Sequence, residues 1–299
     1  MKNKIITTII AVIIISILII SCSTVAFAAQ IAGAVGLVDP NVASAISVSA
    51  TAIGAAAEQI TPEQEYYIGR AVAANILGSY RLWRDKPALT EYLNFICTAI
   101  VINSPRPEIY NGYKVAILDS SEINAFATSG GHIFVTRGLI GAAGSEDALA
   151  GVIAHEIAHI QLQHSIRAIR TNRITQALLV TGTATVGAAT GMNVNELTDV
   201  FNESVGEIVT TMVNNGYSQT QEFDADNTAM SLMASAGYKP SGLLDMLRSL
   251  NNIQTAGSGF GRTHPTPAQR ITNAERTVNN YNVTDNTALR QARFLAATR

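Results

Sequence analysis

Two histidines one helical turn apart constrain this chain more than any other feature of its sequence. His155 and His159 enclose Glu156 in an apolar stretch that follows Ser145, a suitable N-cap. The stretch predicts a helix over residues 146–168. Because an α-helix turns by about 100° per residue, both imidazoles share one face and can bind one tetrahedral metal ion. The carboxylate between them can reach a metal-bound water without being a ligand.

A catalytic metal needs a third protein ligand and one open position. A second predicted helix begins after Ser218, which forms a capping box with Gln221, and continues to Gly237. Glu222 and Asp226 lie four residues apart on one face of it. The pair is sensible if Glu222 binds the cation and Asp226 holds a histidine ligand by its second ring nitrogen. The alternative is an acidic, solvated start of a helix.

Composition excludes several classes of protein. The chain has 299 residues, of which 47% are hydrophobic and only 14% charged, and its formal net charge is −2. Without a basic excess it is not expected to bind nucleic acid, and its aliphatic content is sufficient for a packed core. If Cys22 carries lipid, Cys97 has no partner and no intrachain disulfide can form.

The apolar run at the N-terminus indicates an export signal. Residues 5–20 follow two lysines and stand just before Ser21-Cys22, a pattern that resembles a bacterial lipobox. In this interpretation residues 1–21 are a signal peptide, and Cys22 becomes the lipidated first residue of the mature chain. Two alternatives stay open. One is ordinary signal-peptidase cleavage after Ala28, and the other is an uncleaved anchor, for which the run is short.

The rest of the chain is expected to form one domain with short flanking segments. Residues 22–60 are rich in alanine and predict a tether or an N-terminal helix. A helix that begins at Pro62, with Thr61 as its N-cap, opens a domain over residues 61–280. A C-terminal tail follows over residues 281–299.

Three short strands are expected before the metal-binding helix, over residues 113–118, 125–128 and 132–136, and the last two form a hairpin. The predicted fold class is therefore α+β and mainly helical, with a small sheet or hairpin beside the active-site helix. Residues 174–195 carry no charge. They predict an element packed against protein, with membrane contact as the alternative.

The combined motifs resemble those of the M48 family of zinc metallopeptidases. His155-Glu156-x-x-His159 is followed downstream by Glu222-x-x-x-Asp226. Residues 63–70 look like the opening helix of that family, and Asn124-Ala125-Phe126-Ala127 with residues 130–139 looks like its signature hairpin. The resemblance covers residues 61–275, and the branch it most resembles is that of the exported bacterial lipoproteins.

The resemblance implies a zincin-like metalloprotease domain of the gluzincin type, with one Zn²⁺ per chain. His155, His159 and Glu222 would bind the ion, and Glu156 would be the general base. The implied substrates are unfolded or misassembled proteins of the bacterial cell envelope, in a role of protein quality control. The chain would act in the periplasm, held to the outer membrane by lipid at Cys22. The alternative is an envelope chaperone or assembly factor with a zinc site and little proteolysis.

Three further residues near these motifs have candidate roles. His264 precedes a proline, and family relatives often carry a similar His-Pro segment followed by an arginine, here Arg270. His264 is a candidate catalytic oxyanion donor, a fourth ligand, or a structural loop histidine. Arg270 is predicted to be a structural pairing residue. His164 lies opposite His155 on the predicted helix and is not expected to share the metal.

An edge strand is the predicted substrate-binding element. In zincins, an edge strand beside the metal binds extended substrate through backbone hydrogen bonds. Asn124, Ala125, Phe126 and Ala127 are the predicted residues of that strand. Because such binding depends on the backbone, broad selectivity for unfolded segments is expected.

Overall fold

The computed structural model of the chain divides by its internal contacts into two units. One combines Met1–Gln59 with Ala168–Glu196, and the other combines Ile60–Arg167 with Leu197–Arg299. The second unit carries the residues of the predicted metal-binding motifs. Among the described residues, no helix is both long and apolar enough to cross a membrane. The structure describes residues 60–167, 216–253, 259–264 and 267–299, with the shorter stretches 27–28, 30–32, 34–36, 205–206 and 208–210.

Several sequence predictions therefore lie outside the described residues. They are the signal peptide over residues 1–21, the lipidated Cys22, and the uncharged stretch over residues 174–195.

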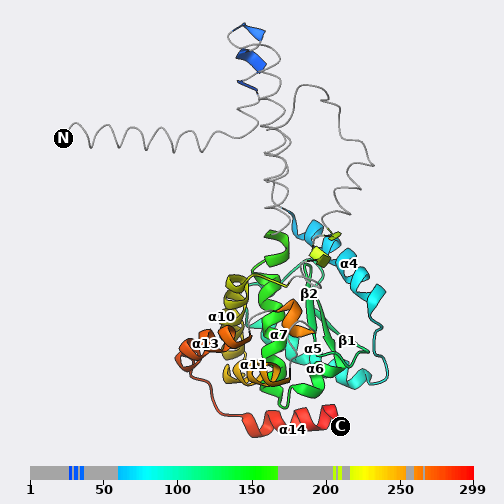
Figure 1. Cartoon of the computed structure of the whole chain (residues 1–299), viewed down its shortest axis with the longest axis vertical. Helices are drawn as coiled ribbons and strands as arrows, with labels where there is room; N and C mark the ends of the chain where they lie inside the picture. Colours follow the sequence, from blue (N-terminus) through cyan, green and yellow to red (C-terminus); the bar gives the residue numbers. More distant parts are fainter. Residues whose placement is uncertain are drawn as a thin grey trace, which may run out of the picture. The chain divides into compact units, whose positions relative to one another are not determined.

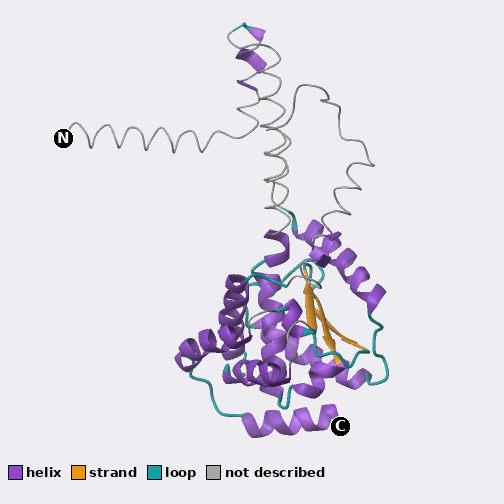
Figure 2. Cartoon of the chain, viewed as in Figure 1, coloured by secondary structure: helices purple, strands orange, loops and turns teal. Residues whose placement is uncertain are grey.

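Helices form most of the second unit and surround one small sheet (Figures 1 and 2). The predicted α+β, mainly helical fold is thereby confirmed. The helices are α4 (Pro62–Ser79), α5 (Pro87–Ile102), α6 (Arg137–Ala142), α7 (Glu146–Gln161), α10 (Gln219–Ser235), α11 (Ser241–Ile253), α12 (Phe260–Thr263), α13 (Pro267–Thr277) and α14 (Thr287–Thr298), with a 3-10 turn at Val278–Asn280. The strands are β1 (Lys114–Leu118), β2 (Ala125–Thr128) and β3 (His132–Thr136).

The sheet has the strand order β1-β3-β2, with β3 parallel to β1 and antiparallel to β2. The predicted hairpin turn is present, and both of its glycines have a positive φ, 82° at Gly130 and 95° at Gly131. Helix α4 packs directly over this turn, since a Cβ on Gly69 would lie 1.3 Å from the Ser129 carbonyl oxygen. A residue with a side chain at position 69 would therefore separate the helix from the hairpin.

Helix α7 forms the centre of the core. Every residue from Glu146 to Ile160 is buried. The helix contacts α10 and α11, and also α5 and strand β2, so it is covered by helices and by the sheet (Figure 1). A helix that is apolar all round is expected in such a position. The backbone of α11 comes so close that a Cβ on Gly151 would lie 2.8 Å from the Leu243 Cα.

The predicted C-terminal end of the metal-binding helix is wrong. The sequence predicts a helix to residue 168, whereas α7 ends at Gln161 and a new turn starts near His164. Between them, Gln163 has a φ of 55°. This left-handed conformation interrupts the helix. The apolar pattern runs past the break, because Ile160 and Ile166 are both buried.

The C-terminal segment also differs from the predicted tail over residues 281–299, because α14 packs against the start of α7. Arg290 Nε lies 2.8 Å from Asp147 Oδ1, and Arg293 pairs with Glu146. Phe294, one turn after Arg290, is buried in the core. The burial of α14 depends on a buried arginine and its ion pair, which a search for apolar periodicity does not detect.

Candidate metal centre

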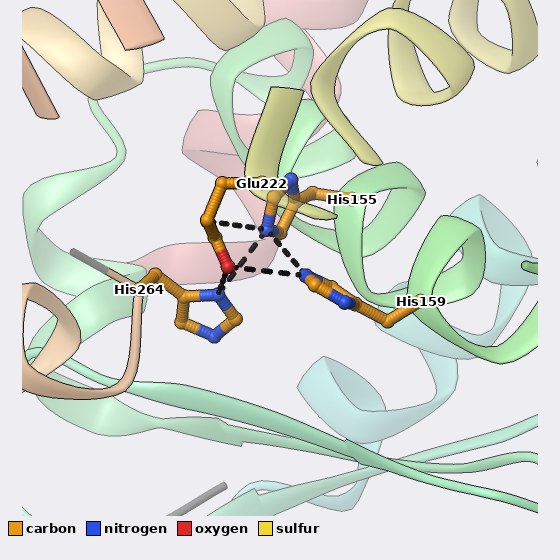
Figure 3. A group of neighbouring side chains, drawn as sticks. All are labelled: His155, His159, Glu222 and His264. Carbon is orange, nitrogen blue, oxygen red and sulfur yellow. Dashed lines mark hydrogen bonds and ion pairs between the residues drawn. The ribbon is translucent and has the colours of Figure 1, made fainter. Parts of the chain in front are cut away.

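Four side chains with metal-binding atoms converge in the interior of the second unit (Figure 3). His155 and His159 come from α7, Glu222 from the first turn of α10, and His264 from the residue after α12. One donor atom from each lies within 4.8 Å of the others, and all four residues are buried. The structure thus brings together the three predicted ligands and the candidate His264.

The donor atoms have the spacing of a small tetrahedral site. The Nε2 atoms of His155 and His159 are 3.0 Å apart, and each lies 3.5 Å from an oxygen of Glu222. Zinc binds imidazole nitrogen at about 2.0–2.1 Å, so two tetrahedral nitrogen ligands lie about 3.3 Å apart. Two histidines and a glutamate are also a known ligand set of catalytic zinc. The residues present therefore fit a zinc ion in both chemistry and distance.

The start of α10 determines where its two carboxylates lie. Ser218 and Gln221 form the predicted capping box, which fixes the helix start. Glu222 and Asp226 are then one turn apart, and both face α7. The Asp226 Oδ1 atom lies 2.9 Å from His155 Nδ1. The sequence predicts such a contact between Asp226 and the second ring nitrogen of a histidine ligand. A carboxylate at this nitrogen orients the ring and leaves Nε2 free for the metal.

Arg270 of α13 neutralises both carboxylates from one buried position. Its Nε and Nη2 atoms donate to Asp226 at 2.8 and 2.7 Å, and its Nη1 lies 2.9 Å from Glu222 Oε2. Burial alone would raise the pKa of both carboxyl groups, but the guanidinium holds each pKa below its usual range. This geometry fits the pairing role predicted for Arg270.

Glu156 lies beside the donor cluster and outside it. Its side chain is buried, and burial raises the pKa of its carboxyl group. A raised pKa makes a carboxylate a better proton acceptor than an exposed one, which suits a general base. Across the site, His264 Nε2 lies 3.3 Å from Glu156 Oε1.

His264 has one ring nitrogen among the donor atoms and the other toward Glu156. Its Nδ1 lies 3.2 Å from His155 Nε2 and 3.2 Å from Glu222 Oε1. The residue is buried, and its backbone N–H donates to the Phe260 carbonyl at 2.7 Å. In this arrangement His264 occupies the position of a fourth ligand.

Two further residues contact His159 and were not predicted to do so. His164 is buried, with its Nδ1 2.8 Å from His159 Nδ1. Burial lowers the pKa of His164 to about 4, so its ring is neutral at neutral pH. The ring of Tyr217 stacks on His159 with centroids 4.1 Å apart. Tyr217 directly precedes Ser218, the N-cap of α10. A position next to a helix start does not by itself predict a contact with His159.

The predicted substrate strand is at an edge of the sheet, but it is covered. By strand order β2 pairs only with β3, yet all four residues of β2 are buried. The segment that carries His264 is attached to its start, because Thr263 Oγ1 donates to Asn124 Oδ1 at 2.9 Å. The Phe260 N–H also donates to the Ile123 carbonyl at 2.8 Å. Binding of substrate along β2 therefore stays a prediction.

Comparison with known proteins gives one family and several relatives. The family described as Peptidase family M48 matches residues 87–278. The "Beta-barrel assembly-enhancing protease" of Escherichia coli (strain K12) is 26% identical over 225 residues, which cover 72% of this chain and 44% of the relative. The "Metalloprotease LoiP" of the same strain is 28% identical over 189 residues, 62% of this chain and 69% of the relative.

A eukaryotic protein is also similar. The "Mitochondrial metalloendopeptidase OMA1" of Schizosaccharomyces pombe is 26% identical over 170 residues, 54% of this chain and 46% of the relative. The chain spans less than half the length of the assembly-enhancing proteases that it matches.

Proposed function

The chain belongs to peptidase family M48, and on that premise we propose that it is a zinc-dependent endopeptidase of the bacterial cell envelope. One observation carries the proposal. His155, His159, Glu222 and His264 place their donor atoms together in a buried site, and the buried Glu156 carboxylate lies 3.3 Å from His264 Nε2. A structural zinc site would not need that carboxylate, and such sites are usually closed and rich in cysteine.

His155, His159 and Glu222 would hold the zinc ion. A zinc ion bound there supplies Lewis-acid polarisation of the scissile carbonyl and lowers the pKa of water. Glu156 takes a proton from the attacking water and passes it to the leaving amine, a task for which a carboxyl group with a raised pKa is suited. Asp226 keeps the His155 ring in the ligand orientation.

His264 closes the site in the arrangement described, since its Nδ1 lies among the ligand atoms. A substrate carbonyl would need that position, so His264 must turn away before a peptide can bind. The same movement separates its Nε2 from Glu156 and frees the base. In the open site, we propose that the imidazole donates a hydrogen bond to the oxyanion. We therefore assign both predicted roles to His264, ligand in the closed site and donor in the open one.

The proposed substrates are unfolded or misassembled envelope proteins. The name of the E. coli relative connects that protein with β-barrel assembly, and the N-terminal pattern of residues 1–21 with Cys22 supports export and attachment to the outer membrane. An edge strand such as β2 would select extended segments of any sequence. Mass spectrometry of the mature N-terminus tests the anchor, because a free Ala29 would exclude lipid on Cys22.

Zinc content and cleavage, measured together, test the function. The purified chain should contain one zinc ion and hydrolyse a loosely folded protein. The Glu156→Gln variant should keep the zinc and lose at least about 100-fold in cleavage, since it lacks the proton acceptor. The matched control is Asp224→Asn, a change of an exposed carboxylate on the same segment as the third ligand. Full activity of Glu156→Gln would overturn the mechanism.

The same variant tests the alternative of a chaperone or assembly factor. The closed position of His264 favours that alternative, because a site that opens rarely would cleave little. If Glu156→Gln replaces the wild-type gene without loss of envelope function, the catalytic role is secondary.

A further inference from the structure

The two ring nitrogens of His159 have different partners. Its Nε2 faces His155 Nε2 at 3.0 Å and Glu222 Oε1 at 3.5 Å. Its Nδ1 lies 2.8 Å from His164 Nδ1, on the other side of the ring. Two bare nitrogen lone pairs repel at such a distance, so one of the two Nδ1 atoms must carry a proton.

Metal binding determines whether His159 Nδ1 or His164 Nδ1 carries the proton. A neutral imidazole carries one N–H, and His159 can bind a metal through Nε2 only if that proton is on its Nδ1. His159 Nδ1 is then the donor, and His164 Nδ1 must be the acceptor. His164 thus takes the place that Asp226 takes for His155. Ligand histidines usually donate this second N–H to a carboxylate, a carbonyl or a water.

The fold builds this contact by interrupting a helix. On a continuous α7, His164 would lie on the side opposite His155, whereas the break at Gln163 turns it back toward the site. The break is anchored to distant segments. Gln163 Nε2 donates to Glu65 Oε2 of α4 at 3.1 Å, and Gln161 Nε2 donates to Ser104 Oγ at 2.8 Å.

Tyr217 restrains the same ring from its face. Its ring is inclined by 20° to that of His159, with centroids 4.1 Å apart, and lies 5.8 Å from that of His164. Stacking limits the tilt of the His159 ring, but a 180° rotation about its Cβ–Cγ bond would keep the stack and exchange the nitrogen and carbon positions of the ring. The hydrogen bond to His164 is what fixes that rotation.

We propose that His164 is a positioning residue of the metal centre, which accepts the hydrogen bond from His159 Nδ1 and thereby fixes Nε2 toward His155 and Glu222. The inference rests on the zinc site proposed above and adds a residue to its support. His164 does not touch the metal or the substrate, so its effect must appear in metal binding and in ligand geometry.

Two variants of similar size separate the hydrogen bond from the packing. His164→Leu fills the space without an acceptor, and His164→Asn offers Oδ1 at about the distance of the lost Nδ1 from the backbone. Zinc affinity is measured by competition with a chromophoric chelator. We expect His164→Leu to weaken zinc binding about 10- to 100-fold and His164→Asn to keep most of the wild-type affinity. His132→Ala, which removes a histidine from β3, is the matched control and should bind like the wild type.

Cobalt substitution reports ligand geometry at saturating metal. We expect the visible spectrum of the cobalt-loaded His164→Leu variant to differ from that of the wild type, and the His164→Asn spectrum to match it. Wild-type zinc affinity in His164→Leu, or equal losses in both variants, would overturn the inference alone. A wild-type chain that binds no zinc would overturn the proposed function, and the inference with it.

Discussion

The two proposed ligand histidines of α7 are oriented by opposite kinds of surroundings. His155 contacts Asp226, which is held in turn by the Arg270 guanidinium. His159 contacts the neutral His164 at its Nδ1, and its ring face stacks on Tyr217. Both arrangements solve one problem, which is to turn Nε2 inward. The His155 side uses buried charges that depend on one another, whereas the His159 side uses a neutral hydrogen bond and aromatic packing.

Removing Arg270 from the His155 side should cause the largest loss of folding stability at either histidine. Arg270→Met leaves Asp226 and Glu222 buried without their cation, which should destabilise the fold by about 3–5 kcal/mol. Urea unfolding of the metal-free protein measures this cost. The control is Arg248→Met, which removes a half-exposed ion pair with Glu275 and should cost about 0–1 kcal/mol. Equal costs for the two variants would mean that the buried charges are not interdependent.

The charged side should also depend on pH. The pKa of Asp226 in the folded chain is below its usual value, so its contribution to stability is present at neutral pH. That contribution is lost as the pH falls from the usual aspartate pKa of about 4 through the folded-state pKa, because over this range the unfolded chain takes up more protons than the folded chain. The stability difference between wild type and Asp226→Asn should therefore be largest at neutral pH and shrink below about pH 4. A stability difference between wild type and Asp226→Asn that grows in acid would contradict the ion pair between Asp226 and Arg270.

The smallest effect is expected on the neutral side. Tyr217→Leu keeps apolar volume but loses the stacked pair, which should cost about 0.5–1.5 kcal/mol beyond the change in buried area. Neither Tyr217 nor leucine titrates between pH 6 and pH 7, and His164, with a pKa of about 4, stays neutral there, so the loss should be the same at these two pH values. Urea unfolding at the two pH values checks this. A loss that changes with pH would show that the His159 side is not electrostatically neutral.

Helical periodicity, helix capping and turn glycines were sufficient to predict several local features that the structure shows. The shared face of His155 and His159 follows from helical periodicity alone, and the position of Glu222 follows from the capping box at Ser218. The hairpin before α7 likewise follows from its glycines. In each case, the residues that determine the geometry are close together in the chain.

Distant contacts explain what the sequence did not predict. The end of α7 has no glycine or proline to mark it, and the side chain of Gln163 finds its partner 98 residues away in α4. The approach of His264 to His155 spans 109 residues. Helix α14 depends on a buried ion pair between Arg290 and Asp147. None of these contacts follows from periodicity, because each depends on the packed core.

The most direct test of the metal centre is anomalous X-ray diffraction at the zinc absorption edge from crystals of the purified chain. We predict a single peak per chain, in contact with the Nε2 atoms of His155 and His159 and with a carboxylate oxygen of Glu222. The absence of a peak in zinc-soaked crystals, or a peak that lies away from these three side chains, would contradict it.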